Sequence, residues 1–252
     1  MQTNREAILT CSLRELNVED NINTIRNAIY DGAEAFMLHL EKLEECYHNK
    51  EDLRKLFNYA ADKPVFSVNY RTHRRPNKTD EELVEGQLIA LEAGAEVLDI
   101  FADLYCPSFD EITYDEEAIR KQKELINKVH ELGGKVMLSS HTFRFLTCEE
   151  TIKHLKELES RGADMVKIAV TASSKEELDE VNRTTIWCLS YYELCTFGAI
   201  PTALSVSYAD SSPRGRAKSV CKSVKQFDKR EFEDGLRPCW GMIFIPQQSL
   251  WV

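Results

Sequence analysis

The sequence predicts an α/β fold, a (β/α)8 TIM barrel formed by a single domain over residues 1–252. The length gives about 31 residues for each of eight units, roughly what one strand, one helix and two short loops use. Short apolar runs alternate with segments of helical spacing, which indicates a parallel sheet covered by helices. An open doubly wound sheet is the alternative, but no strand is followed by a G-x-G-x-x-G or P-loop turn.

A tripeptide, Gly-Ala followed by an acidic residue, recurs along the chain. It occupies residues 32–34, 94–96 and 162–164, each time directly before an apolar run. The intervals are about twice the length of one strand–helix unit, so these runs are predicted to be alternate strands of a regular array.

Eight short apolar runs are the predicted strands. In chain order they are 7–13, 35–40, 64–70, 97–102, 136–140, 165–170, 199–206 and 239–245. The chain stops at Val252, soon after the last run, so the eighth unit is predicted to be atypical and to lack its outer helix.

Helix starts are marked by a hydroxyl residue followed three positions later by glutamate. In this spacing the two side chains satisfy free amide donors of the first turn reciprocally. The pairs are Thr79 with Glu82, Thr113 with Glu116, and Ser174 with Glu177.

Composition excludes several classes of protein. The 32 Lys and Arg against 42 Asp and Glu give a net charge of −10, which argues against non-specific nucleic-acid binding. No apolar run approaches the roughly 20 residues that span a bilayer, so we expect no membrane insertion and a cytoplasmic location. The 8 cysteines lie far apart without a C-x-x-C pair, and we interpret them as reduced, small apolar residues.

Lys167 is the most informative polar residue because it interrupts an otherwise apolar predicted strand, 165–170. Burial disfavours the charged ammonium and exposes a free amine, which can attack a carbonyl and form an imine. The structural alternative is a lysine that points outward or pairs with a strand carboxylate such as Asp99, which interrupts the run 97–102.

His141 directly follows the predicted strand 136–140, at the end where the active site of a parallel barrel lies. Histidine is the usual proton shuttle near neutral pH, so we predict a general acid/base role next to the lysine of the neighbouring strand. A structural histidine at a strand end is the alternative.

Two arginines follow predicted strands. Arg71 comes after the third strand and Arg214 lies beyond the seventh. Both could offer forked guanidinium donors to a carboxylate substrate, whereas an exposed loop arginine is the plainer interpretation of Arg214. Metal chemistry is disfavoured because no H-x-H, H-E-x-x-H or D-x-D cluster occurs, and no G-x-S-x-G marks a serine nucleophile. Of the chemistries considered, imine formation on Lys167 is the one that remains.

These residues, in this order, resemble the type I 3-dehydroquinate dehydratases. The resemblance covers about residues 7–214, and its most specific part is the pairing of Ser139-Ser140-His141-Thr142-Phe143 with the segment 162–169 that carries Lys167.

The resemblance implies a (β/α)8 barrel that dehydrates 3-dehydroquinate to 3-dehydroshikimate in the shikimate pathway, with no metal and no dissociable cofactor. It assigns the Schiff base to Lys167 and the proton transfers to His141. Arg214 would hold the carboxylate of this small-molecule substrate, and Arg71 would line the hydroxyl side of the pocket. Gln248, in Pro246-Gln247-Gln248, matches a P-x-Q segment on a closing loop.

The chain departs from the family pattern in three places. His39-Leu40-Glu41 stands where the family has E-x-R, and His73-Arg74-Arg75-Pro76 replaces an acidic loop. About 11 residues are added before the P-x-Q segment and the final helix is absent, which would leave apolar surface for a partner subunit. A homodimer is therefore a hypothesis.

Two other functions stay open at this point. Changed hydroxyl recognition at His39 and Glu41 favours an imine-forming aldolase acting on a related keto-acid. The altered pair and the missing helix also favour a catalytically weak paralogue that binds a metabolite or a protein, whereas the presence of both Lys167 and His141 argues against it.

Overall fold

The computed structural model describes residues 9–71, 78–194 and 239–246. The predicted seventh strand, 199–206, lies outside these residues. In chain order the elements are β1 (Thr10–Leu13), α1 (Val18–Tyr30), β2 (Ala35–His39), η1 (Glu45–Tyr47), α2 (Lys50–Phe57), η2 (Asn58–Ala60), β3 (Val65–Val68), α3 (Asp80–Ala93), β4 (Val97–Phe101), α4 (Glu116–Glu131), β5 (Lys135–His141), α5 (Cys148–Glu159), β6 (Met165–Ala172), α6 (Lys175–Leu194) and β7 (Cys239–Pro246).

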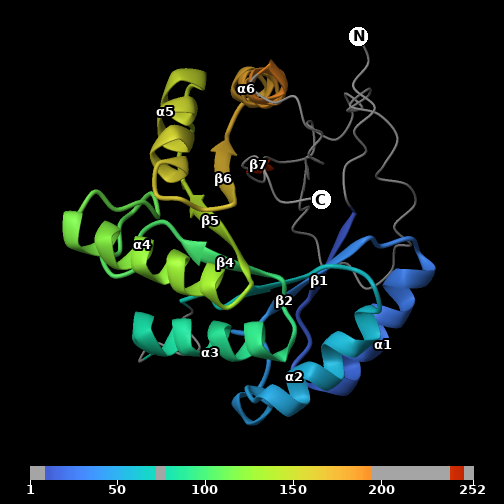
Figure 1. Ribbon diagram of the computed structural model, residues 1–252. Coiled ribbons are helices and arrows are strands. Elements are labelled where there is room, and N and C mark those ends of the chain that lie inside the picture. The colour runs from blue at the N-terminus through green and yellow to red at the C-terminus, as the bar shows by residue number, and fades with distance from the viewer. Residues whose placement is uncertain (1–8, 72–77, 195–238, 247–252) are drawn as a thin grey trace.

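Strands β1 to β6 form a parallel sheet in sequence order, with a helix in each connection. Figure 1 shows that the sheet curls and that helices α1 to α5 lie on its outer side. The prediction of a parallel α/β fold is confirmed, as a curled six-stranded half-barrel of the TIM-barrel kind.

The last strand differs from the prediction. Segment 239–246 is a strand, but β7 pairs antiparallel with β6, with Lys167 opposite Phe244. An eighth barrel strand would instead run parallel and pair with the seventh strand and the first. The apolar pattern of this segment specifies a buried strand and not its direction, and the open edge of β6 can accept hydrogen bonds from either direction.

The recurring tripeptide is a helix-to-strand junction with one geometry. Its glycines, Gly32, Gly94 and Gly162, have φ of 92°, 121° and 95°, the left-handed region that ends a helix and favours glycine. The alanine that follows is at most 5% exposed at all three positions. The N–H of the acidic residue donates to a carbonyl in, or directly before, the neighbouring strand at 2.8 to 2.9 Å. The repeat therefore sets the amino-terminal ends of β2, β4 and β6.

Helix starts agree with the capping pattern in part. Thr79 and Glu82 form the reciprocal capping box of α3 as predicted. The predicted start at Thr113 is wrong, because Asp115 is the N-cap of α4 and its side chain accepts from the N–H of Ala118. The Thr113 side chain is buried, and its carbonyl accepts from Arg161. Thr147 with Glu150 forms a capping box on α5 that the sequence reasoning missed.

Alternate strand residues pack on opposite faces of the sheet. One face contributes to the large hydrophobic core under the helices. The other carries a small inner cluster in which the members come from five successive strands: Met37, Phe66, Val97, Met137 and Met165. This inner face continues toward the carboxyl ends of the strands, where its residues become polar.

Candidate active site

Strand register brings the predicted polar residues onto the inner face. Ser139 of β5 lies opposite Phe101 of β4 on one side and Lys167 of β6 on the other. Asp99 lies two residues before Phe101, and His141 lies two residues after Ser139. Since strand side chains alternate, all of these share one face of the sheet.

Lys167 and Asp99 form a buried ion pair. Lys167 Nζ donates to Asp99 Oδ2 at 2.8 Å, and the two residues are 4% and 0% exposed. The other oxygen of Asp99 accepts from the hydroxyl of Ser139. This pairing is the structural alternative that the strand pattern offers for Lys167. The amine is thus held by a carboxylate at a fixed place on the inner face.

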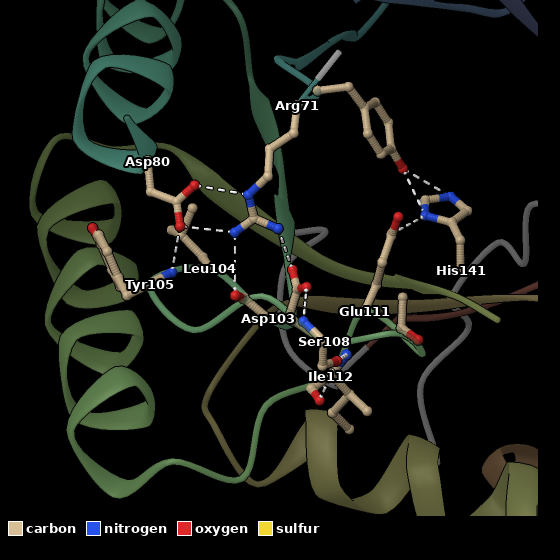
Figure 2. A network of polar contacts seen from close by, with 12 residues as sticks. Arg71, Asp80, Asp103, Leu104, Tyr105, Ser108, Glu111, Ile112 and His141 are labelled. Atoms are coloured by element: carbon tan, nitrogen blue, oxygen red, sulfur yellow. Dashed lines mark hydrogen bonds and ion pairs between the residues drawn. The ribbon is translucent and has the colours of Figure 1, made fainter. Parts of the chain in front are cut away.

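His141 lies between a carboxylate and a phenol. Its Nδ1 is 2.6 Å from Oε2 of Glu111, and the Tyr70 hydroxyl is 2.8 Å from each ring nitrogen. Figure 2 shows Glu111 reaching His141 from the loop between β4 and α4. Both the imidazole and the carboxylate are mostly buried, with side chains 17% and 22% exposed.

The surroundings shift the pKa of both Glu111 and His141. Burial, reinforced by the charge of Asp103, raises the pKa of Glu111 to about 7, although Arg71 and Lys167 oppose the rise. Burial and the nearby charge of Lys167 hold the pKa of His141 well below its usual range. At neutral pH the imidazole is therefore uncharged, as a general base must be.

Arg71 is tied into the protein rather than directed outward. Its guanidinium donates two hydrogen bonds to Asp80, at 2.8 and 2.7 Å, and two to Asp103, at 2.7 Å to the carboxylate and 3.2 Å to the backbone carbonyl. Figure 2 shows the arginine between these two carboxylates. Asp80 also accepts from the N–H of Tyr105, and Asp103 from that of Ser108. Arg71 therefore fastens the loop that carries Glu111.

The two residues predicted at the end of the second strand contact each other. His39 Nδ1 lies 3.0 Å from Oε1 of Glu41, whose other oxygen accepts from the backbone N–H of Tyr70 at 3.3 Å. Glu41 is only 4% exposed. The remaining predicted site residues, Arg214 and Gln248, lie outside the described residues.

Sequence reasoning missed Tyr70 and Glu111. Tyr70 ends the predicted third strand directly before Arg71, so alternation along that strand offered a signal. Glu111 offered none, because it lies in a loop where its φ of 48° is left-handed. Over the described ranges no group of three or more His, Cys, Asp or Glu is placed to hold a metal ion. No helix in the same ranges is long and apolar enough to cross a bilayer.

Comparisons with known proteins identify the family. The model of the type I 3-dehydroquinase family matches residues 9–199. A comparison with curated protein sequences finds no match.

Solved structures share the fold at low identity. The 3-dehydroquinate dehydratase from Geobacillus kaustophilus HTA426 superposes with a TM-score of 0.60 at 15% identity, over 79% of this chain and 74% of that one. The type I enzyme from Clostridium difficile gives 0.59 at 17%, over 80% and 77%. The enzyme from Enterococcus faecalis gives 0.59 at 18%, over 82% and 81%. Since the family model spans residues 9–199 of a chain of 252, the protein belongs to the type I 3-dehydroquinase family.

Proposed function

We propose that this chain converts 3-dehydroquinate to 3-dehydroshikimate through an imine on Lys167, with His141 transferring the protons. The observation that carries the proposal is a lysine, 4% exposed, on the same inner face as a histidine held in its neutral form. The family and the fold support the substrate class, a cyclic polyhydroxy keto-acid.

The reaction starts at the amine. Lys167 Nζ first passes a proton to Asp99, its hydrogen-bond partner, and the neutral amine attacks the C3 ketone. The proton then returns to the ketone oxygen, which leaves as water, and an iminium ion forms. The iminium acidifies the C2 proton because it accepts the electron pair released when that C–H bond breaks. His141 takes the proton, and the product of this step is an enamine.

Elimination follows from the enamine. Its electrons expel the C1 hydroxyl, which leaves as water with the proton that His141 returns, and the conjugated iminium is hydrolysed to release the enone and the free lysine. Asp99 and Ser139 keep the amine in position through this sequence, since one carboxylate oxygen contacts Nζ and the other accepts from the hydroxyl.

A second candidate is an imine-forming lyase that cleaves a related keto-acid. One observation favours it: two carboxylates already engage the guanidinium of Arg71, and His39 and Glu41 engage each other. Arg71, His39 and Glu41, which we expect to bind the hydroxyl groups of the substrate, therefore already form ion pairs or hydrogen bonds within the protein.

One experiment tests both candidates. The protein is incubated with 3-dehydroquinate, reduced with borohydride and mapped by peptide mass spectrometry, while the absorbance of the conjugated enone is followed. We expect an adduct on Lys167 and enone formation. Absence of both overturns the dehydratase, and an adduct formed only with other keto-acids favours the second candidate.

Variants sharpen the experiment. Lys167→Ala should lose the adduct completely, whereas His141→Ala should still form it slowly and lose about 10² to 10⁴-fold in turnover, the usual contribution of a positioned acid/base. Lys123→Ala removes a lysine exposed on α4 and is the matched control. An adduct that persists in Lys167→Ala contradicts the assignment.

A further inference from the structure

We propose that Glu111 is the positioning residue of His141 and that its protonation state decides which ring nitrogen of His141 can accept a proton. The inference deepens the proposed function, because it takes His141 as the base of that reaction. It rests on the contacts of Glu111, on the way its loop is held and on the contacts of the imidazole with Glu111 and Tyr70.

The loop presents the carboxylate in a fixed place. Glu111 has a left-handed φ of 48°, a conformation that persists in a non-glycine residue only where the surroundings hold it. Its neighbour Ile112 makes two hydrogen bonds with the Ser108 hydroxyl, at 3.0 Å through its N–H and 2.7 Å through its carbonyl. The N–H of Ser108 in turn donates to Asp103 at 2.7 Å, and Asp103 is held by Arg71. The strained residue is thus supported on both sides.

The partners of the ring imply its tautomer. An ionised carboxylate can only accept a hydrogen bond, so the contact of 2.6 Å requires the hydrogen on Nδ1 when Glu111 is charged. Nε2 then carries the lone pair, so the Tyr70 hydroxyl, which lies 2.8 Å from both ring nitrogens, can donate only to Nε2. In this state Nε2 can take a proton from substrate once the hydroxyl moves aside. The carboxylate also balances the imidazolium charge that this transfer creates.

Protonation of Glu111 reverses the arrangement. The carboxyl group then donates to Nδ1, the imidazole hydrogen moves to Nε2, and Nε2 donates to the Tyr70 oxygen instead of accepting. His141 stays uncharged throughout, yet the nitrogen that should act as base is blocked. A loss of activity at low pH would therefore reflect protonation of the Glu111 carboxylate and not of the His141 imidazole.

Charged groups on two strands and in two loops surround the pair. Glu111 faces Asp103 in its own loop and Asp99 on β4, which favour its protonated form, and Arg71 after β3 and Lys167 on β6, which oppose it. His141 on β5 faces Lys167, which disfavours a charged imidazole. Together with burial they bring the pKa of Glu111 to about 7 while that of His141 stays well below its usual range. The switch therefore operates near neutral pH.

Kinetics give the first test. The profile of kcat against pH should fall in the wild type as pH drops through about 7. Glu111→Gln should lower kcat by at least about 10-fold, because the uncharged amide cannot balance the imidazolium. Its acid limb should move to lower pH, since the titrating carboxyl is gone. Glu96→Gln, exposed at the opposite end of β4, is the control and should overlay the wild type. An acid limb at the same pH in Glu111→Gln overturns the inference.

Spectroscopy gives a test that needs no turnover. Long-range ¹H–¹⁵N spectra of the imidazole distinguish the two tautomers, and His141→Asn identifies the signals. Between about pH 9 and about pH 5 we expect the wild type to pass from hydrogen on Nδ1 to hydrogen on Nε2, and Glu111→Gln to show no such change. One tautomer across the whole range in the wild type contradicts the switch. The tautomer change without any adduct on Lys167 would overturn the proposed reaction and leave the role of Glu111 intact.

Discussion

At the scale of single residues, the ion pair of Lys167 and Asp99 affects stability, apart from the reactivity that we propose for Lys167. Both groups are nearly inaccessible to water, so removal of either leaves the other as a buried charge without its main partner. Such a loss is typically worth about 3 to 5 kcal/mol, whereas replacing both partners together is often close to neutral.

A double-mutant cycle measures this coupling. We expect Asp99→Asn and Lys167→Met each to lower the free energy of unfolding by about 3 to 5 kcal/mol, and the double variant to lose much less than the sum of the two. Urea denaturation followed by circular dichroism provides the values. Strictly additive losses would show that the two side chains stabilise the fold independently.

The sequence indicates candidate site residues where a charge interrupts an apolar strand. Lys167 and Asp99 stand out for that reason, and strand alternation brings them together with His141 on one face. Glu111 could not be found in this way. Its contact with His141 depends on the path of a loop, which in turn depends on the ion pairs of Arg71, and no period in the sequence encodes these.

At the scale of elements, the sequence pattern indicated that a helix starts near Thr113 but did not identify the residue that caps it. The spacing of Thr113 and Glu116 correctly indicated a helix start, but the cap is Asp115. Buried Thr113 uses its carbonyl to accept from Arg161 and its hydroxyl to accept from the N–H of Asp115. Tertiary contacts therefore moved the helix start by two residues from the local pattern.

Replacement of the cap tests this assignment. Asp115→Ala removes the acceptor of the N–H of Ala118 and should lower the free energy of unfolding by about 1 kcal/mol. Lys123→Ala, in the exposed middle of the same helix, should change it by less than about 0.5 kcal/mol. Chemical denaturation of the two variants decides the matter, and equal stability of Asp115→Ala and the wild type would contradict the cap.

Strand direction is a second property that the local pattern does not contain. The apolar run at the end of the chain was correctly predicted as a strand, yet β7 is antiparallel to β6. Alternation of side chains is the same for both directions, so the apolar pattern alone cannot distinguish them.

At the scale of the whole molecule, two buried titratable groups give opposite pH dependences of stability. Burial, with the charges of Arg161 and Arg144, lowers the pKa of His154 from 6.5 to about 4, although Asp110 opposes the shift. The unfolded chain therefore binds this proton more readily, and the stabilising effect is present above about pH 6.5 and lost as pH falls to about 4. Glu111, raised from 4.5 to about 7, stabilises below pH 4.5 and loses that effect as pH rises through about 7.

The variant His154→Leu separates the contribution of His154 to the pH dependence of stability from that of Glu111. The imidazole is 7% exposed, and its Nε2 has no hydrogen-bond partner among the described residues. As pH falls from about 6.5 to about 4, the wild type should lose about 3 kcal/mol of stability relative to the variant. Urea denaturation at both ends of this range measures the difference. A constant offset between the two proteins would contradict the shifted histidine.

The three Gly-Ala-acid junctions have a consequence for how the protein can change. They lie at the amino-terminal ends of β2, β4 and β6, where left-handed glycines and buried alanines set the register. His141 ends β5 and Glu111 lies in the loop that follows β4, whereas Lys167 is the third residue of β6. The strands are thus aligned at one rim of the sheet, and His141, to which we assign the proton transfers, lies with Glu111 at the other. Loops at the reactive rim can therefore be exchanged, and new specificities acquired, without disturbing the joints on which the architecture depends.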